Sequence, residues 1–481
     1  MKYVSTRAQA PAVDSLQALL NGLAPDGGLY VPEGALAPLP PQTDYRSTME
    51  ALLARFFPEM DAAARQAAVA ASLARFRSAE VVPLREVAPG VHFLELFHGP
   101  TYAFKDVALT LLPHLLSYAA QARHAGEVCV LTATSGDTGS AAMEGFAGVP
   151  GTRVLTFYPQ VGTSEIQRRQ MVCCQGANVA ACAIEGNFDD AQAAVKAAFA
   201  DPALASRARA HGSLLSSANS INIGRLFPQI CYYLECGRRL AAPFDVVVPT
   251  GNFGNLLAAY FAKLLGAPIG RFTVASNANR VVCDFIQTGT YNARRPFHVT
   301  NSPSMDILVS SNVERLLWLL TGGDGAQVRA WEEQLKATGT FTLTPEALTA
   351  LRRDFAAGWA TPEETERAIA ELWQRFNYLA DPHTAIGWKV LQELPATGRP
   401  TVIAATASPW KFPATMLRAL TGTAPADDFA AARALGELTG QTPELLALEA
   451  APIRFSQVTA KAAVPDTIAA SFGFYRSGKE M

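Results

Sequence analysis

The chain has 481 residues, of which 49% are hydrophobic, and its formal net charge is -2. A chain of this length is expected to fold into two or three domains with a large buried core. The near-neutral charge and the lack of a Lys/Arg run argue against a nucleic-acid-binding protein and favour small-molecule chemistry. No apolar run reaches membrane-spanning length, and residues 1–11 lack the apolar core of a secretory signal. We therefore expect a cytoplasmic protein without a membrane partner.

The seven cysteines are an odd number, and Cys173 and Cys174 are adjacent. Their spacing matches no metal-binding pattern. This usage is typical of reduced thiols in a cytosolic compartment. We predict no disulfide and no zinc or other metal site.

Helical patterns dominate the N-terminal part of the chain. Residues 47–56 have the spacing of a helix, and the proline-rich stretch 38–41 interrupts the pattern. This part of the sequence is therefore predicted to form a separate module.

From about Val81 the pattern changes to strands that alternate with turns and helices. Short apolar strands are expected at 128–131, 153–157, 178–184, 245–248, 272–275 and 401–407. Such an alternation is typical of parallel sheets that helices cover on both faces. The predicted fold class is therefore α/β.

Three threonines in the C-terminal third precede a proline, as expected of helix N-caps. They are Thr344, Thr361 and Thr442, and Thr361 also forms a capping-box pattern with Glu364. These signals are structural, and we assign them no chemistry.

Lys105 is expected at a helix start, after an irregular turn that contains several aromatic residues. The charged form of an amine in such a place is disfavoured. A neutral amine attacks a carbonyl group, so Lys105 could carry a Schiff base. The alternative is a solvated lysine whose stem packs on Phe104.

A glycine-rich turn, 249–255, lies between the expected strand 245–248 and an expected helix at 256–263. Glycines allow backbone N–H groups to converge on a phosphate at the positive end of a helix. On its own, such a turn could be an ordinary tight connection. A carbonyl-binding lysine together with a phosphate cup is what pyridoxal 5′-phosphate requires.

The chain resembles the threonine synthases, which are tryptophan-synthase-like, fold type II pyridoxal-phosphate enzymes. The similar segments are 98–106, 133–139, 219–225 and 249–255, and they occur in the family's order. The resemblance extends from Tyr3 through 26–32 to 406–412. It implies two open, mostly parallel sheet domains covered by helices and a mainly helical N-terminal module. The expected division is 1–85 for the module, 86–125 with 236–481 for the large cofactor domain, and 126–235 for a small substrate-binding domain.

The resemblance assigns cofactor contacts to several residues. It implies that Lys105 bonds the cofactor, that Asp137 faces its 3′-oxygen and that Thr406 meets its pyridine nitrogen. The expected phosphate cup consists of Gly251, Asn252, Phe253, Gly254 and Asn255.

Substrate contacts are implied for four other residues. Ser135 and Thr138 would bind the α-carboxylate, although the segment 132–142 could also be a capped turn. Ser220 and Arg225 would bind the substrate's phosphate. For Arg225 the alternative is a surface ion pair.

Three further residues, Ser408, Asp381 and His383, lie in segments that match the family. Ser408 stands where bacterial relatives often have histidine. Asp381 and His383 lie in a matching segment, but His383 has the alternative role of a structural histidine.

The implied activity is the conversion of O-phospho-L-homoserine and water into L-threonine and phosphate, with Lys105 as the acid-base group. One alternative is a pyridoxal-phosphate lyase such as a serine/threonine dehydratase, and Ser220 with Arg225 argues against it. The other is a non-catalytic binding protein on the same scaffold, and an intact Lys105 argues against it. We expect a monomer, with a dimer as the alternative.

Overall fold

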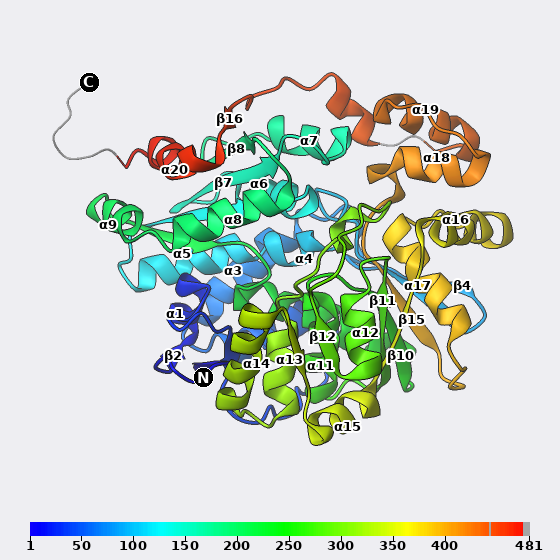
Figure 1. The fold of residues 1–481 in the computed structure, drawn as a ribbon, viewed down its shortest axis with the longest axis horizontal. Helices are drawn as coiled ribbons and strands as arrows, with labels where there is room; N and C mark the ends of the chain where they lie inside the picture. The colour runs from blue at the N-terminus through cyan, green and yellow to red at the C-terminus, as the bar shows by residue number, and fades with distance from the viewer. Residues whose placement is uncertain (442–443, 475–481) are drawn as a thin grey trace.

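Two mostly parallel sheets organise the fold in a computed structural model that describes residues 1–441 and 444–474 (Figure 1). The predicted α/β class, with two helix-covered sheets and an N-terminal module, is confirmed. The predicted helix cap at Thr442 lies outside the described residues.

The larger sheet has six strands, and their order is β14-β11-β10-β15-β5-β4. Only β4 runs antiparallel to its neighbour. The strands are β4 (Leu84–Ala88), β5 (Val91–Glu95), β10 (Phe244–Pro249), β11 (Ile269–Ser276), β14 (Phe355–Trp359) and β15 (Thr401–Ala405). Every residue of β10 and β15 is buried, as expected for central strands with helices on both faces.

The smaller sheet is wholly parallel, and its strand order is β16-β8-β7-β6-β9. The strands are β6 (Glu127–Ala133), β7 (Thr152–Pro159), β8 (Val179–Ile184), β9 (Ser213–Ser217) and β16 (Val458–Thr459). Helices α5 (Leu112–Ala122), α6 (Asp137–Phe146), α8 (Phe188–Phe199), α9 (Pro202–Ala210) and α20 (Val464–Phe472) lie around it.

The C-terminal segment returns to the smaller sheet. Strand β16 pairs with β8, and α20 packs on α8 and α9 (Figure 1, red). This placement differs from the sequence-based division, which assigned the whole of 236–481 to the large domain. A two-residue strand carries too little hydrophobic pattern to reveal its partner. The other domain limits stay predictions.

The N-terminal module contains a small antiparallel sheet that the sequence did not predict. Strands β1 (Lys2–Ser5), β2 (Val13–Asp14) and β3 (Tyr30–Pro32) pair in the order β2-β1-β3. Helices α1 (Ser15–Asn21), α2 (Tyr45–Phe56) and α3 (Ala62–Leu73) complete it. The Phe56 ring stacks on Phe227 of α10 (Phe227–Leu240), with ring centroids 3.9 Å apart. The module is thus anchored on the helix that follows Arg225.

The remaining elements pack on the larger sheet, on the smaller sheet or on one another. The helices are α4 (Lys105–Leu109), α7 (Glu165–Val172), α11 (Gly254–Leu264), α12 (Val281–Thr288), α13 (Val313–Leu320), α14 (Gly325–Thr338), α15 (Pro345–Asp354), α16 (Pro362–Phe376), α17 (Pro382–Glu393), α18 (Pro413–Thr421) and α19 (Asp428–Thr439). A hairpin pairs β12 (Thr290–Asn292) with β13 (Thr340–Thr342). Short 3-10 helices are η1 (Ile223–Arg225), η2 (Pro303–Met305), η3 (Pro409–Lys411), η4 (Glu444–Glu449) and η5 (Lys461–Ala463).

Two of the predicted helix starts are confirmed. The hydroxyl of Thr344 accepts a hydrogen bond from the backbone of Ala347. Thr361 and Glu364 form the expected capping box, with bonds of 3.1 and 2.8 Å. These caps satisfy N–H groups that the first helical turn leaves without partners.

Candidate active site

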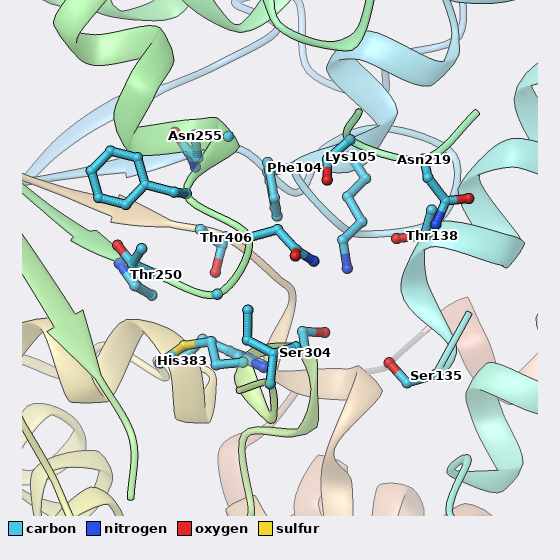
Figure 2. A pocket seen from close by; sticks show the side chains of 18 of the residues that line it. Phe104, Lys105, Ser135, Thr138, Asn219, Thr250, Asn255, Ser304, His383 and Thr406 are labelled. Carbon is cyan, nitrogen blue, oxygen red and sulfur yellow. The ribbon is translucent and has the colours of Figure 1, made fainter. Parts of the chain in front are cut away.

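One pocket is lined by residues that follow strands of both sheets (Figure 2). Ser135 follows β6, Ser220 follows β9, and Thr406 follows β15. In parallel sheets, the loops after the carboxyl ends of the strands are the usual place for a ligand site. Every predicted site residue except Asp137 lines this pocket.

Lys105 is the first residue of α4, where the sequence placed it, and its side chain points into the pocket (Figure 2). Its Nζ lies 3.4 Å from Oδ2 of Asp137. Burial lowers the pKa of Lys105 from its ordinary value, and the Asp137 charge opposes this shift only in part. The amine therefore deprotonates more readily than an exposed lysine.

The turn that carries Lys105 is bonded to the end of β15. The backbone N–H of Phe104 donates to the carbonyl of Thr406 at 2.8 Å, and Ala103 forms an isolated bridge with Ala407. Lys105 and Thr406 are therefore held close together in the lining of the pocket.

Asp137 lies behind Lys105 and is almost fully buried. Its Oδ1 is 2.8 Å from the ammonium nitrogen of Lys411. Burial alone would raise the pKa of Asp137, but the charges of Lys411 and Lys105 hold it well below the usual range. The carboxylate therefore stays ionised.

The turn after β10 presents unpaired donors to the pocket. Within the described part of the chain, the backbone N–H groups of residues 251–254 donate to no other group. Phe253 has a left-handed backbone, with φ 62°, which turns this segment sharply into α11. A Cβ added to Gly251 would lie 3.0 Å from the carbonyl oxygen of Ser304, so a side chain there would crowd the turn.

Asn255 adds a side-chain donor to this turn. Its Oδ1 accepts hydrogen bonds from Tyr232 and Tyr233 of α10, at 2.7 and 2.6 Å. Its buried Nδ2 has no partner among the described residues. A buried donor without a partner is costly, so this turn fits an anion such as a phosphate group.

The turn between β6 and α6 holds two hydroxyls against the pocket. The hydroxyl oxygen of Thr134 accepts hydrogen bonds from the N–H groups of Gly136 and Gly139, at 2.9 and 3.0 Å. Gly136 has φ 151°, and an added Cβ would lie 2.6 Å from Cδ of Gln167. This close turn places Ser135 and Thr138 on the pocket side, as Figure 2 shows.

Arg225 lies in η1 and is 3% exposed, so the alternative of a surface ion pair is wrong. One guanidinium nitrogen, Nη1, donates to the carbonyl of Ala218 at 2.6 Å, whereas Nε has no partner in the described chain. Burial lowers the pKa of Arg225 to about 10, which leaves it charged at neutral pH. With Ser220 on the same wall, this arrangement fits an anionic ligand.

The sequence did not reveal the residues that hold this wall in place. Arg315 of α13 is fully buried and donates to the carbonyls of Ile221 and Tyr30, at 2.6 and 2.9 Å. Asn312 bonds the carbonyls of Ser220 and Asn252, at 3.2 and 3.1 Å. In the sequence both residues are ordinary polar positions at the start of a helix, so no local pattern marks them.

His383 also lines the pocket. Its Nδ1 is 2.6 Å from Oδ2 of Asp381, and its buried Nε2 has no partner among the described residues. The side chain of Ser408 caps η3 by accepting a hydrogen bond from the backbone N–H of Trp410. Its contacts are therefore structural.

No group of His, Cys, Asp and Glu within the described ranges is placed to hold a metal ion. The seven cysteines are buried and unpaired with one another. Among the helices described, none has the length and apolar character needed to cross a membrane.

Comparisons with known proteins agree with this geometry. Family models match residues 76–406 as "Pyridoxal-phosphate dependent enzyme", residues 2–59 as "Threonine synthase N terminus" and residues 384–468 as "Threonine synthase, C-terminal". Threonine synthase from Pseudomonas aeruginosa is 40% identical over 446 residues, which is 89% of this chain and 92% of that protein. Threonine synthase-like 1 from Macaca fascicularis is 37% identical over 84% of this chain and 58% of its own length.

A solved structure extends the similarity to the fold. The pyridoxal-phosphate-bound threonine synthase from Brucella melitensis is 38% identical and has a TM-score of 0.87, covering 98% of this chain and 99% of its own. Fold and pocket are those of a pyridoxal-phosphate-dependent enzyme, and pyridoxal phosphate is the cofactor. Within that class, the chain belongs to the threonine synthase family.

Proposed function

We propose that this pocket converts O-phospho-L-homoserine and water into L-threonine and phosphate, as expected of a threonine synthase. The observation that carries the substrate assignment is Arg225, a buried guanidinium whose Nε has no partner in the described chain, beside Ser220. An enzyme for an unphosphorylated amino acid would have no need for a buried cation at this wall.

The turn after β10 is proposed to hold the cofactor's phosphate. Its free backbone N–H groups and the Nδ2 of Asn255 supply donors without adding a positive side chain. Thr406, which lines the pocket, would contact the pyridine nitrogen, and a neutral hydroxyl there would not force that nitrogen to be protonated. When bound, pyridoxal phosphate supplies an electron sink for charge that develops on the substrate carbon.

The wall beside the smaller sheet is proposed to hold the substrate. Ser135 and Thr138 donate to its α-carboxylate, and Arg225 with Ser220 binds its phosphate. The two anionic groups fix the substrate at both ends, which orients its carbon chain toward Lys105. As the bond between Cγ and the phosphate oxygen breaks, Arg225 and Ser220 stabilise the charge of the leaving phosphate.

Lys105 is proposed to move protons at the substrate. Its Nζ takes the proton from Cα, which requires the neutral amine that burial favours. The same nitrogen is proposed to take a proton from Cβ, and to return protons to Cγ once the phosphate has left and to Cα. Water adds its hydroxyl group to Cβ, its remaining proton goes to the released phosphate, and the product is threonine.

The substrate is a small molecule. We further propose that the enzyme acts as a monomer in the cytoplasm without a nucleic-acid partner. The near-neutral charge supports the last point.

The proposed function is tested by the products formed from O-phospho-L-homoserine. The cofactor-loaded chain is incubated with this compound while phosphate, threonine and 2-ketobutyrate are measured together. Phosphate and threonine in equal amounts are expected. Accumulation of 2-ketobutyrate without threonine would replace the proposal with a lyase, and no product from this substrate would refute the substrate assignment.

A further inference from the structure

Lys411 is a fully buried lysine whose ammonium group is saturated with acceptors. Its Nζ donates to the carbonyl oxygen of Thr101 at 2.7 Å and to Oε1 of Gln170 at 2.9 Å. The third acceptor is Oδ1 of Asp137, at 2.8 Å. An ammonium group has three N–H donors, so Lys411 has none left for a ligand. It therefore acts on the pocket only through its neighbours.

The two oxygens of Asp137 face different partners. Oδ1 accepts from Lys411 and, at 2.8 Å, from Gln167. Oδ2 accepts from Ser304 at 2.9 Å and is 3.4 Å from Lys105. The bond to Lys105 is the longest of the four. Oδ1 of Asp137 is thus held on the side away from Lys105, and Oδ2 does not form a short ion pair with the Lys105 amine.

Cations outnumber anions around this carboxylate. The charged side chains in this cluster come from four elements: Lys105 and Asp106 from α4, Asp137 from α6, Arg225 from η1 and Lys411 from η3. Helix α7 contributes two neutral side chains, Gln167 and Gln170. Asp106 is bonded to Thr101, at 2.6 and 2.8 Å. Asp137 is therefore the only described carboxylate that pairs with Lys105, and Lys105 shares it with Lys411.

We infer that Lys411 is a positioning residue for Lys105: by holding Oδ1 of Asp137, it prevents this carboxylate from forming a tight ion pair with the reactive amine. The importance of that amine rests on the proposed function. Without Lys411, Asp137 would have one cation left beside it and would turn toward Lys105. A tighter pair would favour the protonated amine, which is unable to take a proton or attack a carbonyl.

Hydrogen bonds hold the segment that carries Lys411 against the turn before Lys105. Ser408 caps η3 at its first turn, and the backbone N–H of Ser408 donates to Tyr102 in the turn before Lys105. Lys411 is the last residue of η3 and reaches back to Thr101 in the same turn. The ion pair and the Lys105 turn are consequently one bonded unit.

The inference is tested by the pH midpoint at which Lys105 reacts with acetic anhydride. The full chain, freed of cofactor, is pulsed with the reagent over a pH series, and the peptide that contains Lys105 is quantified by mass spectrometry. The exposed Lys2 serves as an internal reference. In K411M the midpoint of Lys105 is expected to rise by about one pH unit. No substrate is used, so a wrong substrate assignment would leave this result unchanged.

A second background separates positioning from a direct charge effect. In D137N no carboxylate is left to move, so the further change Lys411→Met is expected to shift the Lys105 midpoint much less than it does in the wild-type background. The matched control is K263M, which removes a lysine paired with Asp354 at 2.8 Å outside the pocket and is expected to leave the midpoint unchanged.

Two results would overturn the inference. One is an unchanged Lys105 midpoint in folded K411M, and the other is an equal shift in the wild-type and D137N backgrounds. If K411M does not fold, Lys411→Ala, which also removes the hold on Oδ1 of Asp137, must raise the midpoint in the same direction, whereas K411Q, which keeps a donor for Asp137, must shift it less. Failure of that rise would also refute the role of Lys411.

Discussion

The two walls of the pocket are built from different chemical groups. The large-sheet wall, residues 251–255 with Thr406, presents mostly backbone N–H groups. The small-sheet wall, which consists of Ser135, Thr138, Ser220 and Arg225, presents side-chain hydroxyls and a guanidinium. A backbone cup survives most substitutions, whereas each side-chain donor is lost with a single one. The comparison therefore predicts that substrate handling is more sensitive to point changes than cofactor binding.

Lys105 lies between the walls, and its loss is expected to have the largest effect. Lys105→Ala should lower turnover by about ten-thousandfold or more, because it removes both the proton-transferring amine and the group that bonds the cofactor. Turnover and the visible absorbance of the bound cofactor are measured together. K263M is the matched control. Turnover close to wild type in K105A would show that the reactive group is elsewhere.

Arg225→Ala tests the small-sheet wall directly. The loss of a charged contact to phosphate should lower kcat/KM for O-phospho-L-homoserine by about a hundredfold, while the cofactor remains bound. Arg225→Lys keeps the charge but not the fork of donors, and an intermediate value is expected. Steady-state kinetics at saturating cofactor provide the measurement. An unchanged kcat/KM in R225A would remove the phosphate role.

Ser135→Ala and Thr138→Val should have smaller effects on the same wall. Each removes one donor to the proposed α-carboxylate site, so a rise of about tenfold in KM is expected for each variant. Thermal unfolding of the loaded chain serves as the control for folding. If KM stays constant in both variants, these hydroxyls do not bind the substrate.

The smallest effect is expected outside both walls. Thr361→Ala removes the cap of α16, which is not part of the pocket, and should lower the free energy of unfolding by about 1 kcal/mol. Urea unfolding measures this loss, and kcat/KM should be unchanged. A lower kcat/KM with an unchanged free energy of unfolding would contradict this expectation, because it would show that the pocket depends on the cap of α16.

The sequence predicted those parts of the molecule that local pattern controls. The apolar runs at 128–131 and 245–248 are strands, and Lys105 begins a helix. The order of the motifs also predicted that Ser135, Arg225 and the turn at 251–255 belong to one site, and all of them line the same pocket. The roles of these residues stay predictions.

Long-range contacts could not be predicted in this way. Lys411 pairs with Asp137, which is far away in the sequence, and the residues around each of them give no indication of this contact. The same holds for Arg315, which joins the N-terminal module to the segment after β9 through the carbonyls of Tyr30 and Ile221. Strands as short as β2 and β16 carry too few residues for an alternating pattern.

The most direct test of the two-wall account measures Asn255→Asp and R225A side by side. Asn255→Asp keeps the acceptor for Tyr232 and Tyr233 but replaces the buried donor with an anion. We expect a fall of about a hundredfold in pyridoxal-phosphate affinity for Asn255→Asp, and the larger loss of kcat/KM at saturating cofactor for R225A. Equal losses of cofactor affinity in the two variants would contradict the division of the pocket into a cofactor wall and a substrate wall.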